Sequence, residues 1–318
     1  MATQAFTSIH LEEIGPDLEL PGSLYLFISG KFIEYKMQGD VVPASKYDQF
    51  IMRKMKYLFV KEDEVAIFRK WIGDSRNNEL ELLATITVGD DQKKLVKLKQ
   101  NIKRFMVDIF SSEMQEEKIS NVAMSTRSFI QEMSSNVVPD MAWSNLSSLS
   151  KNIVDHSMNV ALMSIFLADQ VGFGQQKIRE NLFLGSIFHD YGKSLFDHSL
   201  YEAGNEDALK KEMIKHPEMG KNALSSSPSL NQEVLRIIEE HHENYDGSGY
   251  PAGKKKSMIY DLSKIVSVAN EFDHLVQNGH GSHKERAHDA MDELSRGAGN
   301  KFDPDKLQKC LKALKLIF

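Results

Sequence analysis

Histidine and aspartate residues in the second half of the chain stand where apolar segments end. The stretch FLGSIFHDYGKSLF (183–196) is apolar until it reaches His189 and Asp190, and Lys193 follows three residues after the aspartate. Alone, such a pair is more often structural, because an imidazole can bond to a backbone carbonyl and a carboxylate can cap a helix. Four more histidines change this balance, and each lies beside apolar residues: His156, His216, His241 and His242.

A metal centre is the chemistry that this set of side chains favours. A buried polar group without a partner costs roughly 1–3 kcal/mol, whereas a metal ion turns imidazole nitrogens into ligands and the aspartate balances its charge. Five histidines and one aspartate exceed the four ligands of a zinc site. They suit two divalent ions with Asp190 between them. Because no thiolate is among the donors, iron and manganese fit as well as zinc.

Four motifs that contain these histidines resemble those of the HD-GYP domain, a branch of the HD metal-dependent phosphohydrolases. They are HS-N-VA from His156, HDYGK from His189, HPEMG from His216 and HHENYDGSGYP from His241, and the later AGNKFDPDKL is similar to the closing segment of the family. The resemblance covers about residues 143–318. It implies an all-helical domain with two or three metal ions that hydrolyses the bacterial second messenger cyclic di-GMP.

The resemblance also assigns metal ligands, which by motif are His156, His189, Asp190, His216, His241, His242 and Asn270. Asn270 stands where the family has the aspartate of a V-A-D run, so it can offer an amide oxygen but no charge. Asp273, one helical turn later, could compensate from behind the ligands. Family members with a third ion carry a glutamate where this chain has Asn152. We therefore expect two divalent ions, iron first, with manganese or zinc as alternatives.

Catalytic and substrate-binding roles follow from the same resemblance. Asp190 would bridge the two ions, and Lys193 would contact the phosphate or assist the departing 3′-oxygen. Gly249 and Tyr250 would form a tight loop beside the centre, with Tyr250 free to contact the substrate. The loop also has a simpler interpretation, because the sequence Asp-Gly-Ser-Gly that residues 246–249 form is most often an ordinary turn in other proteins.

The family's basic stretch, which follows the V-A-D run and grips guanine bases or phosphates, is missing here. The corresponding residues are HLVQNGHGSHKERAHDAM, and Lys284 and Arg286 are the nearest cations that could replace it. We expect a metal-dependent phosphodiesterase for cyclic di-GMP or a related nucleotide, weak on cyclic di-GMP itself. The alternative is a low-turnover nucleotide receptor or protein-interaction module that retains the metal centre. A phosphohydrolase for mononucleotides is a weaker third hypothesis.

The elements that must position these residues are mainly helices. Apolar residues recur at helical spacing from about Trp143 onward, between serine, glycine and Asp-Pro signals that mark helix ends. The helices predicted in this part of the chain span residues 147–172, 233–247, 263–279 and 302–318. The predicted fold is therefore mainly α, with an all-helical HD-GYP domain over residues 143–318.

Two further parts precede that domain. Residues 1–90 predict a small α+β domain, which we expect to be a dimerisation or ligand-sensing module. In it, residues 22–37 form two strands around the turn Ser29-Gly30-Lys31, and a helix and a third strand follow. Residues 91–142 predict a helical connector. Its apolar stripe is more typical of core packing than of a signal-carrying coiled coil, and consists of Leu95, Leu98, Ile102, Phe105, Ile109 and Phe110.

Composition excludes several classes of function. A net charge of −6 without a basic block argues against general nucleic-acid binding. The single Cys310 fits a reducing compartment. No signal peptide or membrane helix is evident, so we expect a cytoplasmic protein without membrane contact. The expected partners are cyclic di-GMP or a related nucleotide, a diguanylate cyclase of the GGDEF type and a second copy of the chain.

Overall fold

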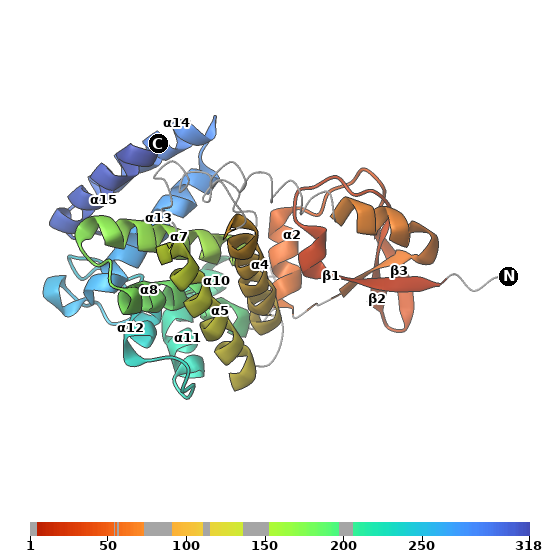
Figure 1. Cartoon of the computed structure of the whole chain (residues 1–318), viewed down its shortest axis with the longest axis horizontal. Helices are drawn as coiled ribbons and strands as arrows, with labels where there is room; N and C mark the ends of the chain where they lie inside the picture. Colours follow the sequence, from red (N-terminus) through yellow and green to blue (C-terminus); the bar gives the residue numbers. More distant parts are fainter. Residues whose placement is uncertain are drawn as a thin grey trace.

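The computed structural model describes residues 5–53, 55, 57–72, 91–110, 115–135, 153–196 and 206–318. A small sheet unit lies at one end of the molecule and a larger body of helices at the other (Figure 1). This arrangement confirms the predicted fold class, which is mainly α with one small α+β part before the helical domain.

The sheet unit contains four strands in the order β1-β4-β2-β3, and all neighbours are antiparallel. Its elements are β1 (Phe6–His10), α1 (Leu11–Ile14), β2 (Leu24–Ile28), β3 (Lys31–Lys36), α2 (Ala44–Met52), β4 (Tyr57–Lys61), a 3-10 turn (Glu62–Glu64) and a helix over 65–72. The predicted hairpin is confirmed as β2 and β3. Ser29 and Gly30 join these strands with φ angles of 50° and 79°, which is the left-handed geometry of a tight hairpin turn. Strand β1 was not predicted from the sequence.

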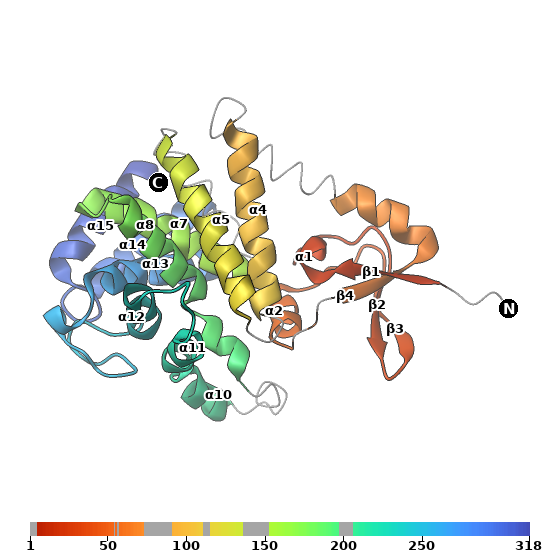
Figure 2. The ribbon, with the colours of Figure 1, turned by 60° about the horizontal axis from the view of Figure 1, so that its bottom comes forward.

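Two long helices follow, α4 (Asp91–Phe110) and α5 (Glu116–Ser135), which lie side by side (Figure 2). The predicted stripe of α4 is buried at Ile102, Ile109 and Phe110, as expected for core packing. The two helices pack against α7 (Ile153–Val171) and α8 (Gln176–Phe188) of the helical body. Both predicted domain boundaries border on or fall within segments outside the described residues, so the division into three parts stays a prediction.

The helical body is organised around α7, which is buried over most of its length and contacts α4, α8, α13 and α15. Its predicted end is confirmed, because Gly172 follows with a φ of 96°; its predicted serine caps lie outside the described residues. The other elements are η2 (Tyr191–Leu195), α10 (Glu206–Met213), α11 (His216–Leu224), α12 (Gln232–Glu240), η3 (Lys256–Met258), α13 (Asp261–Asn278), α14 (His283–Arg296) and α15 (Pro304–Ile317). The last helix begins as predicted, with Asp303 accepting from the amides of Asp305 and Lys306.

One predicted helix was too long. The apolar periodicity of residues 233–247 predicts a helix up to Gly247, but α12 ends at Glu240. The loop that follows is held from outside the helix, because the buried Glu243 carboxylate accepts from the amides of Ala252 and Lys254 at 2.7 and 2.8 Å. These tertiary contacts outweigh the continued helical periodicity.

Over the ranges that the structure describes, every helix falls short of the length and apolar character that a membrane span requires.

Candidate metal centre

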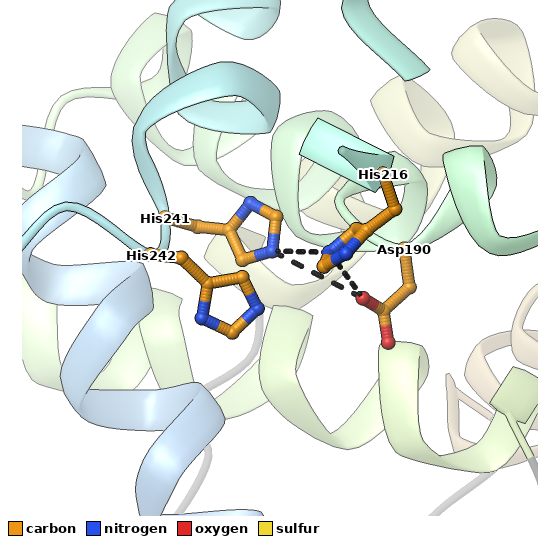
Figure 3. Close-up of side chains that lie close together, drawn as sticks. All are labelled: Asp190, His216, His241 and His242. Atoms are coloured by element: carbon orange, nitrogen blue, oxygen red, sulfur yellow. Dashed lines mark hydrogen bonds and ion pairs between the residues drawn. The ribbon is translucent and has the colours of Figure 1, made fainter. Parts of the chain in front are cut away.

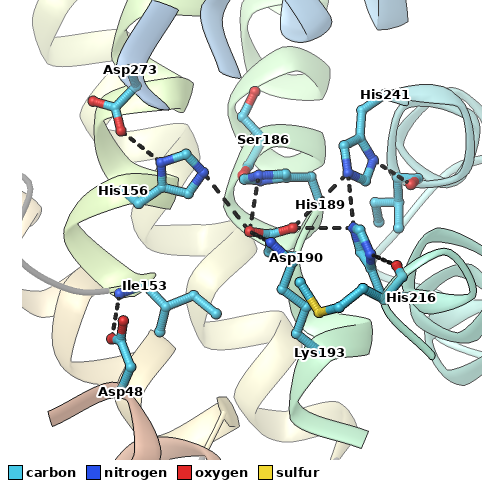
Figure 4. Close-up of polar contacts among 12 residues, drawn as sticks. Asp48, Ile153, His156, Ser186, His189, Asp190, Lys193, His216, His241 and Asp273 are labelled. Atoms are coloured by element: carbon cyan, nitrogen blue, oxygen red, sulfur yellow. Dashed lines mark hydrogen bonds and ion pairs between the residues drawn. The ribbon is translucent and has the colours of Figure 1, made fainter. Parts of the chain in front are cut away.

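Four buried histidines surround the carboxylate of Asp190. Its Oδ1 atom lies 3.2 Å from Nε2 of His216 and 4.0 Å from Nε2 of His241 (Figure 3). Its Oδ2 atom lies 3.5 Å from Nε2 of His189 and 3.8 Å from Nε2 of His156 (Figure 4). Each carboxylate oxygen therefore faces its own pair of imidazole nitrogens, which is the arrangement expected of a bridging ligand.

The ends of helices bring these side chains together. His156 lies in the first turn of α7, and His189 and Asp190 follow the last residue of α8. His216 begins α11, and His241 with His242 follows α12. The sequence therefore predicted correctly that the histidines stand where apolar segments end.

Glycine at position 192 lets two of these segments approach each other. A Cβ atom on Gly192 would lie 1.9 Å from the carbonyl oxygen of His216 and 2.9 Å from the amide nitrogen of Gly220. Only glycine tolerates such backbone contact. The glycines of the HDYGK and HPEMG motifs thus let η2 lie against α11, and Asp190 thereby reaches His216.

Backbone carbonyls orient three of the rings. Nδ1 of His189 lies 2.6 Å from the oxygen of Ser186, Nδ1 of His216 lies 2.5 Å from that of Met213, and Nδ1 of His241 lies 2.8 Å from that of Ile238. These carbonyls belong to the last turns of α8, α10 and α12, where helices leave acceptors unpaired. Because Nδ1 must be the donor to a carbonyl, the neutral ring presents the lone pair of Nε2 to Asp190.

A carboxylate orients the fourth ring. Nδ1 of His156 lies 2.6 Å from Oδ2 of Asp273, whose Oδ1 accepts from Asn159 at 3.2 Å. Gln277 donates to the same Asp273 carboxylate. A carboxylate behind a histidine is the usual arrangement around metal-binding imidazoles. The expected place of Asp273 behind the ligands agrees with this contact.

Several buried acceptors at the centre have no hydrogen-bond partner among the described residues, namely His156 Nε2, His189 Nε2, Asp190 Oδ1 and Asn270 Oδ1. The 3.2 Å approach of His216 to Asp190 does not satisfy the carboxylate, because the hydrogen of that ring is donated to Met213. Nε2 of His216 likewise faces Nε2 of His241 at 3.1 Å, one lone pair against another. Converging acceptors of this kind are unfavourable unless a cation lies among them.

The donor set therefore fits metal ions. One group consists of Asp190, His216, His241 and His242, and a second of His156, His189 and Asp190; within each group the ligand atoms lie within 4.8 Å of one another. Asp190 belongs to both groups, as a bridge between two ions would. All the donors are nitrogen or oxygen, which suits iron, manganese or zinc.

Burial keeps three of the histidines, His189, His241 and His242, in the neutral form that binds metals. It lowers the pKa of His189 to about 4 and holds the pKa values of His241 and His242 well below the ordinary range. Burial has the opposite tendency at Asp190, favouring the protonated acid, but the neighbouring His189 and Lys193 outweigh it and hold the pKa of this carboxyl well below its usual value. At neutral pH the ionised carboxylate of Asp190 thus lies near the neutral rings of His189, His241 and His242.

Helix α13 contributes one predicted ligand and one residue that the sequence analysis missed. The amide oxygen of Asn270 is buried and has no hydrogen-bond partner in the described part of the chain, as a ligand atom would, and its ligation stays a prediction. His274 was overlooked; its ring stacks on His156, with centroids 4.4 Å apart, and burial lowers its pKa to about 3. The position of His274, four residues after Asn270, could have indicated that both share a helix face. Asn152 lies outside the described residues.

Three of the five predicted substrate-binding residues, Lys193, Gly249 and Tyr250, lie in segments next to the centre. Lys193 donates from Nζ to Oδ2 of Asp190 at 2.6 Å. The ring of Tyr250 stacks on that of His242 at a centroid distance of 4.7 Å, and its amide donates to the carbonyl of His242 at 3.1 Å. Gly249 allows this tight loop, since a Cβ there would lie 2.2 Å from the amide nitrogen of Asn244.

The other two predicted substrate contacts lie on α14. Lys284 is exposed, and Nη1 of Arg286 donates to the carbonyl of Val276, near the end of α13, at 3.3 Å. Within the described ranges, neither cation forms a hydrogen bond or ion pair with the residues around Asp190. Their role in binding a nucleotide stays a prediction.

The family assignment rests on the same part of the chain. A family model described as the HD domain matches residues 140–305, just over half of the chain. The chain belongs to the HD domain family. Its motifs agree with the HD-GYP branch. Its fold is similar to that of a structure described as Bd1817, a HDG"Y"P protein from Bdellovibrio bacteriovorus. That comparison covers 98% of this chain and 100% of the other with a TM-score of 0.63, and at 22% identity it shows the fold alone.

Curated relatives of this HD domain protein are named as cyclic dinucleotide phosphodiesterases. It is 31% identical over 165 residues to a cyclic di-GMP phosphodiesterase of Thermotoga maritima, covering 51% of this chain and 45% of the relative. It is 33% identical over 152 residues to the cyclic di-GMP phosphodiesterase response regulator RpfG of Xanthomonas campestris, covering 46% and 39%. It is 31% identical over 162 residues to the 3'3'-cGAMP-specific phosphodiesterase 2 of Vibrio cholerae, covering 49% and 30%. The chain spans less than half the length of these relatives.

Proposed function

We propose that this chain is a metal-dependent phosphodiesterase that hydrolyses cyclic di-GMP or a related cyclic dinucleotide. The observation that carries this proposal is the position of Asp190, whose two oxygens each face a different pair of buried imidazole nitrogens. A centre for two ions is suited to a phosphodiester, whose charged oxygens can lie against both. The curated relatives, named as phosphodiesterases for cyclic di-GMP and cGAMP, support the substrate class.

Two divalent ions are proposed as cofactors, iron first, with manganese or zinc as alternatives. When bound, they would supply Lewis acidity, which acidifies water and stabilises negative charge on a phosphoryl group. The ligands would be His156, His189, Asp190, His216, His241 and His242, with the amide oxygen of Asn270 in addition. A thiolate is not available from the single Cys310, which is buried on α15 with its pKa raised to about 12 by burial.

Lys193 and Tyr250 would act on the substrate. The ammonium of Lys193 lies beside Asp190 and can also donate a hydrogen bond to a phosphate oxygen of the substrate. The same group can protonate a departing 3′-oxygen. Burial, with Asp190 and Glu271 nearby, raises the pKa of Tyr250. Its phenol therefore stays protonated and can donate a hydrogen bond to the substrate, while His242 holds its ring in place.

A second candidate is a cyclic-nucleotide receptor or protein-interaction module with little turnover. Two observations favour it. Asn270 brings no charge to a buried position where the family has an aspartate. The guanidinium of Arg286 donates a hydrogen bond to the carbonyl of Val276 near the end of α13. One of the two cations that could replace the family's basic stretch therefore has another partner. A GGDEF-type partner, a homodimer and a cytoplasmic location stay predictions from the sequence.

An anaerobic metal reconstitution tests the proposal and separates the two candidates. Protein loaded with iron or manganese is assayed on cyclic di-GMP, 3'3'-cGAMP and a nitrophenyl phosphodiester, beside chelated protein and a Lys193→Ala variant with matched metal content. A phosphodiesterase gives turnover that depends on metal and falls by about 10²- to 10⁴-fold without the lysine. Nucleotide binding without turnover in the loaded protein supports the receptor. A loaded protein that neither binds nor hydrolyses these nucleotides contradicts both candidates.

A further inference from the structure

Helix α2 belongs to the sheet unit but also lies against the helical body (Figure 2). Two side chains attach it to its own unit. The hydroxyl of Tyr47 donates to the carbonyl of Leu11 at 3.1 Å, and the ring of Phe50 meets that of Tyr35 edge-on at 5.3 Å. The same helix contacts α4 and η2 of the helical body. A displacement of the sheet unit would therefore move α2 relative to those helices.

Asp48 of α2 makes a hydrogen bond to the helix that carries His156. Its Oδ1 accepts from the amide of Ile153 at 2.8 Å (Figure 4). Ile153 is the first residue of α7, and the first amides of a helix have no partner within it. A carboxylate is the favoured acceptor at such an end, because it also opposes the positive end of the helix dipole. Here the acceptor comes from a residue more than a hundred positions earlier in the chain.

The pKa of Asp48 reflects its surroundings at the end of α7. Burial raises this pKa to about 6, the hydrogen bond from Ile153 opposes the shift, and the negative charge of Asp155 adds to it. Asp155 itself is paired with Lys103 of α4 at 2.6 Å. The carboxylate of Asp48 thus lies at the junction of α2, α4, α7 and η2.

Two of the three segments that α2 contacts at this junction, α7 and η2, carry residues of the centre. His156 follows Ile153 by three residues and lies in the same first turn of α7. Lys193 lies in η2, whose Tyr191 ring is packed edge-on against Phe110 of α4 at 5.7 Å. If α2 withdraws, the amide of Ile153 loses its partner and the first turn of α7 is free to fray. His156 would then leave its position opposite Asp190.

We propose that Asp48 is a positioning residue through which the sheet unit controls the metal affinity of the centre on its His156 side. The inference rests on the proposed metal centre and adds a regulatory role for the N-terminal unit. Coupling of this kind is reciprocal. Docking of α2 therefore strengthens metal binding by the same factor by which bound metal strengthens the docking of α2.

Titration of the metal-free full chain with manganese(II) tests this role. Asp48→Ala removes the acceptor, whereas Asp48→Asn retains an oxygen that caps a helix about as well. Asp63→Ala removes an exposed carboxylate elsewhere in the sheet unit and is the matched control. We expect Asp48→Ala to weaken binding of the more weakly held manganese ion by about fivefold, because the loss of a helix N-cap usually has an effect of this size. Asp48→Asn and Asp63→Ala should bind like the wild type.

Wild-type affinity in a folded Asp48→Ala variant would overturn the inference. A wild-type chain that binds no manganese would instead overturn the metal centre, so the two failures are distinguishable. Hydrogen exchange on the wild type gives a test that depends on no variant. Manganese should slow the exchange of amides in residues 44–52 and 153–156, and unchanged exchange in residues 44–52 of the metal-loaded protein would contradict the coupling.

Discussion

Asp273 holds His156 through a contact of 2.6 Å between Oδ2 and Nδ1, and the opposite nitrogen of that ring faces Asp190 at 3.8 Å. A carboxylate of α13 thereby determines where a ring on α7 points. Asn159 and Gln277 hold the carboxylate in turn. The orientation of His156 depends on a tertiary contact, because its Nδ1 faces a carboxylate of α13, whereas Nδ1 of His189, His216 and His241 faces a backbone carbonyl three residues earlier in the chain.

Asp273→Ala should therefore weaken metal binding without removing any ligand. Loss of a group that orients a ligand typically costs about 10- to 100-fold in metal affinity. Calorimetric titration with manganese measures it, and Asp289→Ala, an exposed carboxylate of α14, is the control. Equal affinity of Asp273→Ala and the wild type would mean that His156 is oriented by other contacts or is not a ligand.

Asp190→Ala should be the most damaging single change at the centre. It removes the carboxylate that both groups of donors share, and leaves two cations facing each other without an anion between them. Elemental analysis of anaerobically purified protein should fall from about two equivalents of metal in the wild type toward zero or one. A variant with full metal content and activity would show that Asp190 is not the bridge.

Gly192→Ala should separate η2 from α11. Its new methyl group would lie 1.9 Å from the carbonyl of His216, and backbone cannot give way as a side chain can. Forced overpacking costs about 1–3 kcal/mol, and the shift would also carry Asp190 away from His216. Denaturant unfolding and manganese titration should both report the change. Gly174→Ala, where the nearest atom is a side-chain oxygen at 3.3 Å, is the control and should be close to neutral.

The sequence predicted the convergence of the histidines on Asp190 better than it predicted the elements around them. His189, Asp190 and His216 lie in short motifs whose neighbours, such as Gly192, are themselves required by the packing, so the pattern is visible locally. The end of α12 was missed because Glu243 terminates it through contacts with Ala252 and Lys254, which helical periodicity does not report. Asp48 gave no signal at all, since its partner amide is more than a hundred residues away.

The metal-free protein should become more stable as the pH rises from about 4 to 6.5. The folded-state pKa of His274 is about 3 and that of His189 about 4, below the unfolded value of about 6.5. In this window the unfolded chain binds protons that the folded chain does not, so rising pH favours the folded state. His274→Gln should reduce the slope of unfolding free energy against pH by at most about 1.4 kcal/mol per pH unit. An unchanged slope would show that His274 titrates normally.

Hydrolysis of cyclic di-GMP should be weak compared with that of simpler phosphodiesters. A centre for two ions can hold any phosphodiester by its charged oxygens, so selectivity for cyclic di-GMP must come from groups that reach the bases and the second phosphate. Lys284 is exposed on α14, and Arg286 bonds to the carbonyl of Val276 at 3.3 Å. Each missing charge-assisted contact is worth roughly 1.5–3 kcal/mol, or about one to two decades of affinity.

A comparison of rates on cyclic di-GMP and a nitrophenyl phosphodiester, with metal content matched, checks this expectation. Lys284→Ala and Arg286→Ala identify any cation that has replaced the basic stretch, because loss of such a contact raises KM for cyclic di-GMP and leaves the nitrophenyl rate unchanged. Arg286→Ala should instead lower only the stability of the protein, because its guanidinium donates to the carbonyl of Val276 on α13. Rapid, saturable cyclic di-GMP turnover that either substitution abolishes would show that α14 supplies the nucleotide clamp.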